Sequence, residues 1–144
     1  MADEPDDNSY VLEDQIGHLL RRAHQRATQI FLETFANADL TPTQWAALSK
    51  LASETAASQN HLGRMTAMDP ATIQGVIRRL EARGLVGRTD DPNDRRRTLL
   101  RLTEAGEAMV EKVTAIAFQV SARTLAPLDD DDRARLLAML KKLV

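Results

Sequence analysis

The sequence predicts a mainly α-helical protein with one small β-hairpin. Leucine and alanine dominate its apolar residues, whereas β-branched and aromatic runs are scarce, and this composition favours helices. Several segments place apolar residues at helical spacing behind a capping residue, and two short strand-like runs flank the polar stretch DDPNDRRR. A chain of 144 residues is long enough to form one domain with a substantial core.

A long helix is predicted near the N-terminus, from about Tyr10 to Asn37, after a polar and acidic tail at residues 1–8 that we expect to be disordered. Its apolar arc is too wide for one neighbour within the chain, and the last helix carries a leucine-rich stripe with little to cover it. Both terminal regions are therefore predicted to form a dimer, the alternative being that they pack within the chain. The residues of the N-terminal arc are Ile16, Leu20, Ala23, Ala27, Ile30 and Phe31.

Capping signals predict where the remaining helices begin and end. The Thr-Pro-Thr-Gln sequence from Thr41 combines a capping box with a proline at the first helical position. The predicted N-caps are Thr41, Ser58, Asp69 and Thr103. Gly84 should end the fourth helix in a left-handed conformation. The fifth helix should reach about Leu125 before Pro127 breaks it, and the carboxylates of Asp129–Asp132 suit the start of the last helix.

Two short strands are predicted at Leu85–Thr89 and Thr98–Leu102. Their connection, DDPNDRRR, reads as too long and polar for a tight turn, so it should project as a loop-like wing. A short helix, a turn, a longer helix and a winged hairpin in this order form a winged helix-turn-helix, which places one helix in a DNA groove. The predicted divisions are a tail at 1–8, a dimerisation helix at 9–37, the winged helix-turn-helix at 38–102 and C-terminal helices completing the dimerisation region at 103–144.

The fourth helix has one apolar arc and one arc suited to DNA. Its core-facing residues are Ile73, Val76, Ile77 and Leu80, and the opposite arc holds Ala71, Thr72, Gln74, Gly75, Arg78 and Arg79. Ala71 and Gly75 would let the backbone approach the groove. By residue type, Gln74 suits adenine and Arg78 suits guanine, while Thr72 and Arg79 suit phosphates.

The hairpin adds the arginines Arg95, Arg96 and Arg97, which repel one another unless an anion lies near and are suited to a narrow minor groove. Asp94 either orients one guanidinium or begins the turn. An arginine-bearing helix face alone is often merely solvated, but the helix and the hairpin together favour DNA binding. The net charge of −2 does not oppose this, because the arginines cluster between 78 and 101 while acidic residues gather near both ends of the chain.

The segment DPATIQGVIRRLEARGLVGRTDDPNDRRRTLLRLTEAG resembles the signature of the multiple-antibiotic-resistance regulator (MarR) family, and LTPTQWAAL resembles the second helix of that family. The D-R-R…L-T-x-x-G element, from Asp94 to Gly106, is the most specific part. The resemblance implies a homodimeric winged-helix repressor, less often an activator, whose first and last helices interlock and whose DNA is released by small anionic aromatic ligands. It also implies groove-facing positions at Ala71, Thr72, Gln74, Gly75 and Arg78, and wing arginines at Arg95 and Arg96 with Asp94 as their partner.

A ligand site is predicted near the first helix. Arg21 and His24 share one side of that helix, and the helices carrying Trp45 and His61 should approach it. Arginine would pair with a carboxylate and the indole would stack on a ring, which suits a small aromatic acid. The stretch HLLRRAHQRATQIF resembles the branch of the family that controls breakdown of aromatic and nicotinate-type acids. The alternative is that the four residues are boundary, core, solvated or dimer-facing positions.

Other classes of protein find little support in the sequence. No run approaches the ~20 apolar residues of a membrane span, and no signal-peptide pattern opens the chain. The absence of cysteine excludes disulfides and thiolate metal sites, and it suits the cytoplasm. No HExxH, glycine-rich phosphate loop or nucleophile elbow is present, so we expect no catalytic residues, cofactor or metal. The remaining alternative is a winged-helix module that binds protein, for which an arginine-rich wing is unnecessary.

Overall fold

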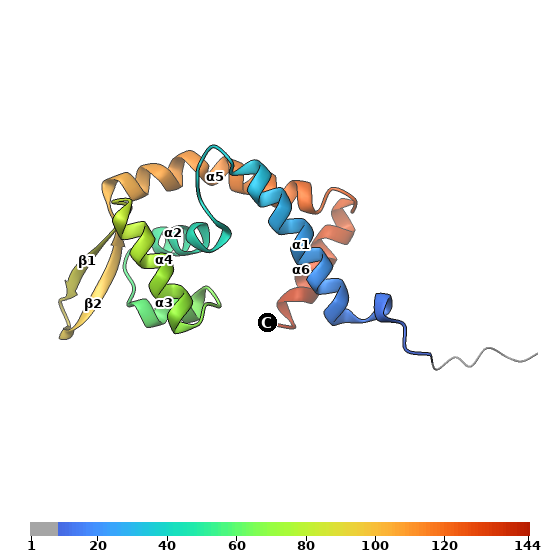
Figure 1. Ribbon diagram of the computed structural model, residues 1–144, viewed down its shortest axis with the longest axis horizontal. Coiled ribbons are helices and arrows are strands. Elements are labelled where there is room, and N and C mark those ends of the chain that lie inside the picture. Colours follow the sequence, from blue (N-terminus) through green and yellow to red (C-terminus); the bar gives the residue numbers. More distant parts are fainter. Residues whose placement is uncertain (1–8) are drawn as a thin grey trace, which may run out of the picture.

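The computed structural model describes residues 9–144 and contains six α-helices and one hairpin within that range (Figure 1). In chain order these are η1 (Leu12–Asp14), α1 (Ile16–Thr34), α2 (Pro42–Glu54), α3 (Gln59–Met65), α4 (Pro70–Ala82), β1 (Val86–Asp91), β2 (Asp94–Leu102), α5 (Glu104–Thr124) and α6 (Asp130–Lys141). Helices α2, α3 and α4 gather with the hairpin at one end of the molecule, α1 and α6 lie at the other, and α5 joins the two (Figure 1). The predicted fold class is confirmed.

The predicted helix caps are confirmed. Thr41 accepts a hydrogen bond from the Gln44 N–H, and Gln44 returns one to the Thr41 N–H, which completes the capping box. The side chains of Ser58, Asp69, Thr103 and Asp129 likewise cap α3, α4, α5 and α6. Gly84 follows α4 with a φ of 70°, in the left-handed region.

The predicted first helix is wrong at both ends. A short 3₁₀ turn at Leu12–Asp14 comes first, and Gln15 then adopts an extended conformation with φ −84° and ψ 133°, so α1 starts only at Ile16. At the other end α1 stops at Thr34, because the chain must reverse before α2, and Asp39 turns it with a φ of 53°. Helical spacing alone could not locate these breaks. The predicted tail at 1–8 lies outside the described residues.

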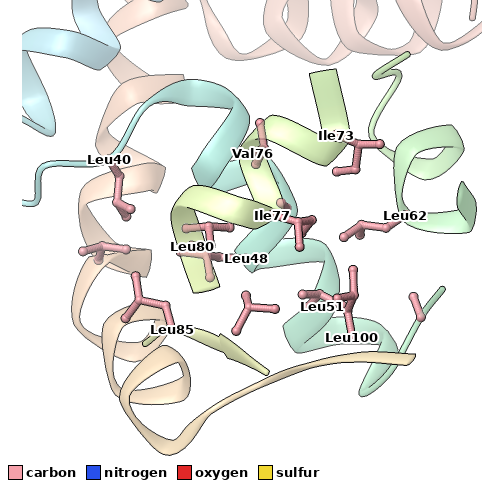
Figure 2. Close-up of a cluster of buried hydrophobic side chains, with 14 of the residues drawn as sticks. Leu40, Leu48, Leu51, Leu62, Ile73, Val76, Ile77, Leu80, Leu85 and Leu100 are labelled. Atoms are coloured by element: carbon pink, nitrogen blue, oxygen red, sulfur yellow. The ribbon is translucent and has the colours of Figure 1, made fainter. Parts of the chain in front are cut away.

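The core packs α4 against α2, α3 and the hairpin (Figure 2). The four apolar residues predicted to face inward, Ile73, Val76, Ile77 and Leu80, are all buried. Their neighbours in the same cluster include Leu48, Leu51, Leu62, Leu85 and Leu100. Burying each such side chain contributes roughly 1.5–3 kcal/mol relative to leaving it exposed. The rotation of α4 about its own axis is thereby set.

The hairpin differs from the prediction, because its strands extend through the stretch expected to be a loop. The strands pair from Val86 with Leu102 to Asp91 with Asp94, with an irregularity between Asp90 and Asp91. Only residues 92–93 connect them. Asp91 accepts a hydrogen bond from the Asn93 N–H at 2.9 Å, and Asp94 accepts one from the Arg96 N–H at 3.0 Å. These carboxylates accept hydrogen bonds from backbone N–H groups of a tight turn. The polar character of the DDPNDRRR stretch did not by itself distinguish this role from that of a long loop.

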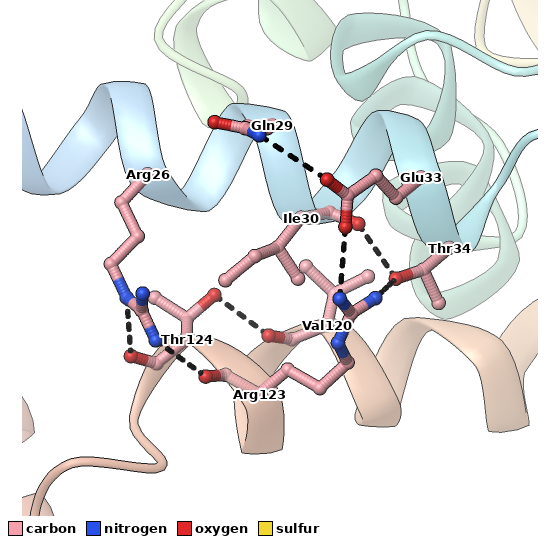
Figure 3. Close-up of polar contacts among 8 residues, drawn as sticks. All are labelled: Arg26, Gln29, Ile30, Glu33, Thr34, Val120, Arg123 and Thr124. Atoms are coloured by element: carbon pink, nitrogen blue, oxygen red, sulfur yellow. Dashed lines mark hydrogen bonds and ion pairs between the residues drawn. The ribbon is translucent and has the colours of Figure 1, made fainter.

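Helix α1 is tied to the C-terminal end of α5 by polar contacts around the side chains of Ile30 and Val120 (Figure 3). Arg123 donates to the Thr34 hydroxyl at 2.7 Å and pairs with Glu33 at 2.9 Å. Hydrogen bonds from Arg123, and secondarily from Gln29, lower the pKa of Glu33. In the reverse direction, Arg26 donates to the backbone carbonyls of residues 123 and 124 at the end of α5.

Gly106 permits the closest backbone approach in the region that follows the hairpin. It lies buried in the first turn of α5, and a Cβ atom there would overlap the carbonyl oxygen of Leu85. The Thr103 N–H donates to the same carbonyl, at 3.1 Å, so this oxygen is held in place. The glycine of the L-T-x-x-G element therefore joins α5 closely to the start of the hairpin.

We expect Gly106→Ala to lower the free energy of unfolding by about 1–3 kcal/mol, because the added methyl group meets backbone that cannot move aside. Urea denaturation followed by circular dichroism measures this. Gly17→Ala is the matched control: it adds a methyl group to α1 where nothing lies within 4 Å, and should leave stability unchanged or raise it by up to about 1 kcal/mol. Equal stability of Gly106→Ala and the wild type would contradict the close approach.

Candidate nucleic-acid interface

The outward arc of α4 carries the side chains predicted to read DNA. Ala71, Thr72, Gln74, Arg78 and Arg79 are exposed, and Gly75 is half-buried. The structure thus brings all six predicted helix residues onto one solvent-facing surface, opposite the buried arc in Figure 2. A Cβ atom on Gly75 would meet only the guanidinium of Arg79, at 3.8 Å, so the backbone at this position is open to an approaching molecule.

The start of α4 is organised by Asp69. Its carboxylate accepts hydrogen bonds from the Thr72 N–H and from the Thr72 hydroxyl, both at 2.8 Å. These two hydrogen bonds, in that order, lower the pKa of Asp69. The hydroxyl hydrogen of Thr72 is therefore already used within the chain. Thr72 can still offer its methyl group and a hydroxyl lone pair to the groove.

The predicted DNA-contacting arginines have no acidic partners within the described residues. Ion pairs there involve other basic residues, among them Arg88, whose guanidinium lies 2.8 Å from Glu81. Arg83 donates to the backbone carbonyl of Asp39. Two members of the sequence cluster between 78 and 101 therefore serve the fold. Among the other arginines of that cluster, the guanidinium groups of Arg78, Arg79, Arg95, Arg96, Arg97 and Arg101 form no ion pair within the described residues.

The three wing arginines lie on β2, where successive side chains point to opposite faces of a strand. Arg95 and Arg97 share one face and Arg96 takes the other, so a hairpin entering a groove presents cations on both sides. Of the two roles considered for Asp94, the structure shows the turn-forming one: its carboxylate binds the Arg96 backbone N–H, and no guanidinium lies within ion-pair distance. Arg97 reaches the Ser58 hydroxyl at 3.5 Å.

The four residues predicted to bind a ligand do not share a pocket within one chain. Trp45 lines a cavity of about 360 Å³ between α2 and α5, called here the Trp45 cavity. Arg21 and His24 are exposed on the N-terminal half of α1, and His61 is exposed on α3. The indole packs beside Phe35, with ring centroids 5.8 Å apart.

The other residues that line the Trp45 cavity were missed by sequence reasoning. They are Ser49, Val110, Thr114, Ala117, Phe118 and Ser121. Val110, Thr114, Ala117 and Ser121 follow one another at intervals of four, three and four residues, so they form one face of α5. This spacing was visible in the sequence, but small and hydroxyl side chains do not distinguish a cavity wall from a helix contact. Phe118 stands at the cavity with 73% of its surface exposed.

The acidic run at the start of α6 has a structural role. Asp129 accepts a hydrogen bond from the Asp132 N–H at 2.8 Å, and Asp130 lies 3.8 Å from Arg133, as expected for a cap and a first turn. Within residues 9–144, three or more histidine or carboxylate side chains nowhere gather in a way that could hold a metal ion. Over the same residues, every helix is too short or too polar to cross a membrane.

Known proteins share this sequence and fold. The sequence model of the MarR family matches residues 40–98. The HTH-type transcriptional repressor NicR of Pseudomonas putida is 38% identical over 139 residues, which cover 96% of this chain and 88% of NicR. A probable transcriptional regulator from Pseudomonas aeruginosa has a crystal structure that superposes with a TM-score of 0.89 at 46% identity, covering 93% of this chain and 100% of that one.

BpsR of Bordetella bronchiseptica, whose DNA binding is regulated by 6-hydroxynicotinic acid, superposes with a TM-score of 0.90 at 39% identity, over 94% of this chain and 97% of BpsR. These similarities extend from the N-terminal helix to the C-terminal helix, well beyond the segment that carries the family signature. The chain, with its winged helix-turn-helix and its outward-facing arginines, belongs to the MarR family of transcriptional regulators.

Proposed function

We propose that this protein is a homodimeric repressor that leaves a pseudo-palindromic operator when it binds a small aromatic or heteroaromatic acid. The observation that carries the DNA-binding part is the set of unpaired guanidinium groups on two neighbouring elements, α4 and β2. Cations left without partners on one protein surface are available to neutralise phosphates. Such a repressor works where the DNA is, which in a bacterium is the cytoplasm.

Helix α4 is the element proposed to enter the major groove. Gln74 and Arg78 reach base edges by donor and acceptor type, and Ala71 and Gly75 permit close approach of the helix. Arg79 contacts a phosphate. Thr72 contributes through its methyl group or a hydroxyl lone pair, since Asp69 already accepts its hydrogen.

The hairpin is proposed to lie in the adjacent minor groove. Arg95 and Arg96 point to opposite faces of β2 and would follow the two walls of a narrow groove, where the potential is most negative. Asp94 supports them indirectly by fixing the turn. Arg97 lies nearer the base of the hairpin, beside Ser58.

The dimer is proposed to form through the apolar residues that both ends of the chain expose. At the N-terminal end these include Tyr10, Ile16, Leu19 and Leu20, and at the C-terminal end Leu137, Met139 and Leu143, each more than 40% exposed. The two groups lie at the same end of the molecule, the end where Figure 1 shows α1 and α6. A symmetric dimer would present two α4 helices to half-sites about one helical turn apart.

The effector is proposed to bind in the Trp45 cavity. The indole offers a stacking surface, and the hydroxyls of Ser49 and Ser121 offer polar contacts. The regulation of BpsR by 6-hydroxynicotinic acid supports a heteroaromatic acid. Arg21, His24 and His61 remain proposed contacts, although they lie outside this cavity in one chain. They reach the acid if the dimer or a conformational change brings them to it.

Release follows if the ligand binds more tightly to a dimer whose α4 helices no longer match the operator spacing. A ligand that binds both conformations equally shifts nothing. The cavity lies between α2, which belongs to the DNA-binding end, and α5, which runs to the dimerisation end. A molecule that binds between α2 and α5 therefore favours one position of the DNA-binding end relative to the dimerisation end.

Arg78→Ala should weaken binding to a selected operator by about 1–3 kcal/mol and relax preference at one base pair, because a bidentate base contact is lost. Arg95→Ala should weaken binding to every duplex and lower the slope of log K against log salt by about 0.9, because one phosphate charge is no longer neutralised. Fluorescence anisotropy at several salt concentrations measures both.

Lys112→Ala removes one exposed cation from α5 and is the control, expected to bind like the wild type. Unchanged operator affinity in both arginine variants would show that the contacts are wrongly assigned. A wild-type protein whose duplex binding is weak and independent of salt would instead favour a module that binds protein.

The single tryptophan makes ligand binding directly visible. Titration with 6-hydroxynicotinate should change the emission of Trp45 and, over the same concentration range, lower operator affinity, because ring and indole stack in the cavity. Benzylamine, which is aromatic but cationic, is the control ligand and should do neither. Operator affinity that stays constant while acids occupy the cavity would rule out the proposed release.

A further inference from the structure

A polar recess of about 330 Å³ lies between α3 and the wing strand β2, separate from the residues that sequence reasoning assigned to the α4 surface. Every side chain that lines it carries a hydrogen-bond donor, and two carry a guanidinium group. No carboxylate contributes to its wall. The lining residues are Ser58, Gln59, Asn60, Arg64, Arg97 and Thr98.

Both guanidinium groups of the recess are available to a ligand. In the described part of the chain, neither Arg64 nor Arg97 forms an ion pair. The one side-chain contact of Arg97 is the long 3.5 Å hydrogen bond to Ser58, and Arg64 is exposed. Two cations held beside one hollow repel each other, and an anion between them removes that repulsion.

Arg88, which contacts one residue of the recess wall, is paired with an acid. Glu81 is paired with Arg88, whose Nε lies 2.9 Å and whose Nη2 lies 2.8 Å from the same carboxylate oxygen. Arg88 also donates to the Gln59 side-chain oxygen, at 3.3 Å. Gln59 thus presents its oxygen to Arg88, which leaves its NH₂ group free to donate. Arg88 both neutralises the acid and orients a donor.

The recess continues toward α4. A second hollow of about 270 Å³ shares Asn60 and Arg64 with the first and extends to Pro70, the first residue of α4. Asn60 and Arg64 therefore lie where the two hollows meet. Together the hollows form a groove from β2 to the start of α4, the helix proposed to enter the major groove. Its occupant should be a chain that passes between these two elements.

We propose that the recess binds a phosphodiester of the DNA backbone, with Asn60 and Arg64 as contacts beyond those identified from the sequence. The inference rests on the proposed function. A protein with α4 in the major groove and the hairpin in the adjacent minor groove must straddle the backbone strand that separates the two grooves. The recess and the second hollow together run from the hairpin to the start of α4, and the guanidinium, amide and hydroxyl donors of the recess match phosphate oxygens.

Arg64→Ala should weaken operator binding about tenfold or more, because a hydrogen-bonded contact to a charged group is lost. It should lower the salt slope by about 0.9 and leave base preference unchanged, because a phosphate contact carries no sequence information. Asn60→Ala should weaken binding less and keep the slope. Arg135→Ala, an exposed arginine on α6, is the matched control and should resemble the wild type. Circular dichroism melting checks that each variant folds.

Duplexes with one neutral methylphosphonate in place of each phosphate in turn locate the contact. At one position per half-site, the substitution should weaken wild-type binding but have little further effect on Arg64→Ala, because the same interaction is removed twice. If Arg64→Ala and Asn60→Ala keep full affinity while Arg78→Ala loses it, the recess is not a backbone site and the proposed function stands. If the wild type binds no duplex, the proposed function fails first.

Discussion

The burial of one arc of α4 is the constraint on which the rest of the DNA-binding surface depends. Ile73, Val76 and Ile77 are each at most 2% exposed, so the helix cannot rotate without moving apolar surface into water. That orientation turns Gln74 and Arg78 outward. The same core also contains Leu85 and Leu100 at the base of the hairpin, so the helix and the wing are positioned by one packed cluster.

Four carboxylates of this protein bind backbone N–H groups, and this helps a chain with net charge −2 to keep a basic surface. Asp69 and Asp129 cap helices, whereas Asp91 and Asp94 satisfy the tight turn of the hairpin. Because these acids bind N–H groups, they do not pair with the arginines that lie near them in the sequence. Average charge is therefore a poor guide to the surface that a partner meets.

Local signals predicted much of this fold, and non-local packing accounts for the errors. Capping residues located five helix starts, and helical spacing identified the inner arc of α4. The extended conformation of Gln15 leaves no such signal, and the strand character of the wing arginines depends on a two-residue turn that looked like part of a long loop. Of the predicted ligand contacts only Trp45 lines the cavity. Apart from Phe118, the α5 side of the wall consists of residues that would equally suit an ordinary helix contact, so the sequence did not reveal it.

Helix α5 is fastened at both ends. Its first turn is pressed against Leu85 through Gly106, and its last turn is bound to α1 through Arg26 and Arg123. A helix of this length spans about 32 Å, so a tilt of about 10° about its first turn, where Gly106 meets Leu85, carries its far end some 5 Å. That displacement exceeds the ~3.4 Å axial spacing of neighbouring base pairs. A small tilt of α5 is thus sufficient to move the two α4 helices of a dimer away from the spacing of their half-sites on the DNA.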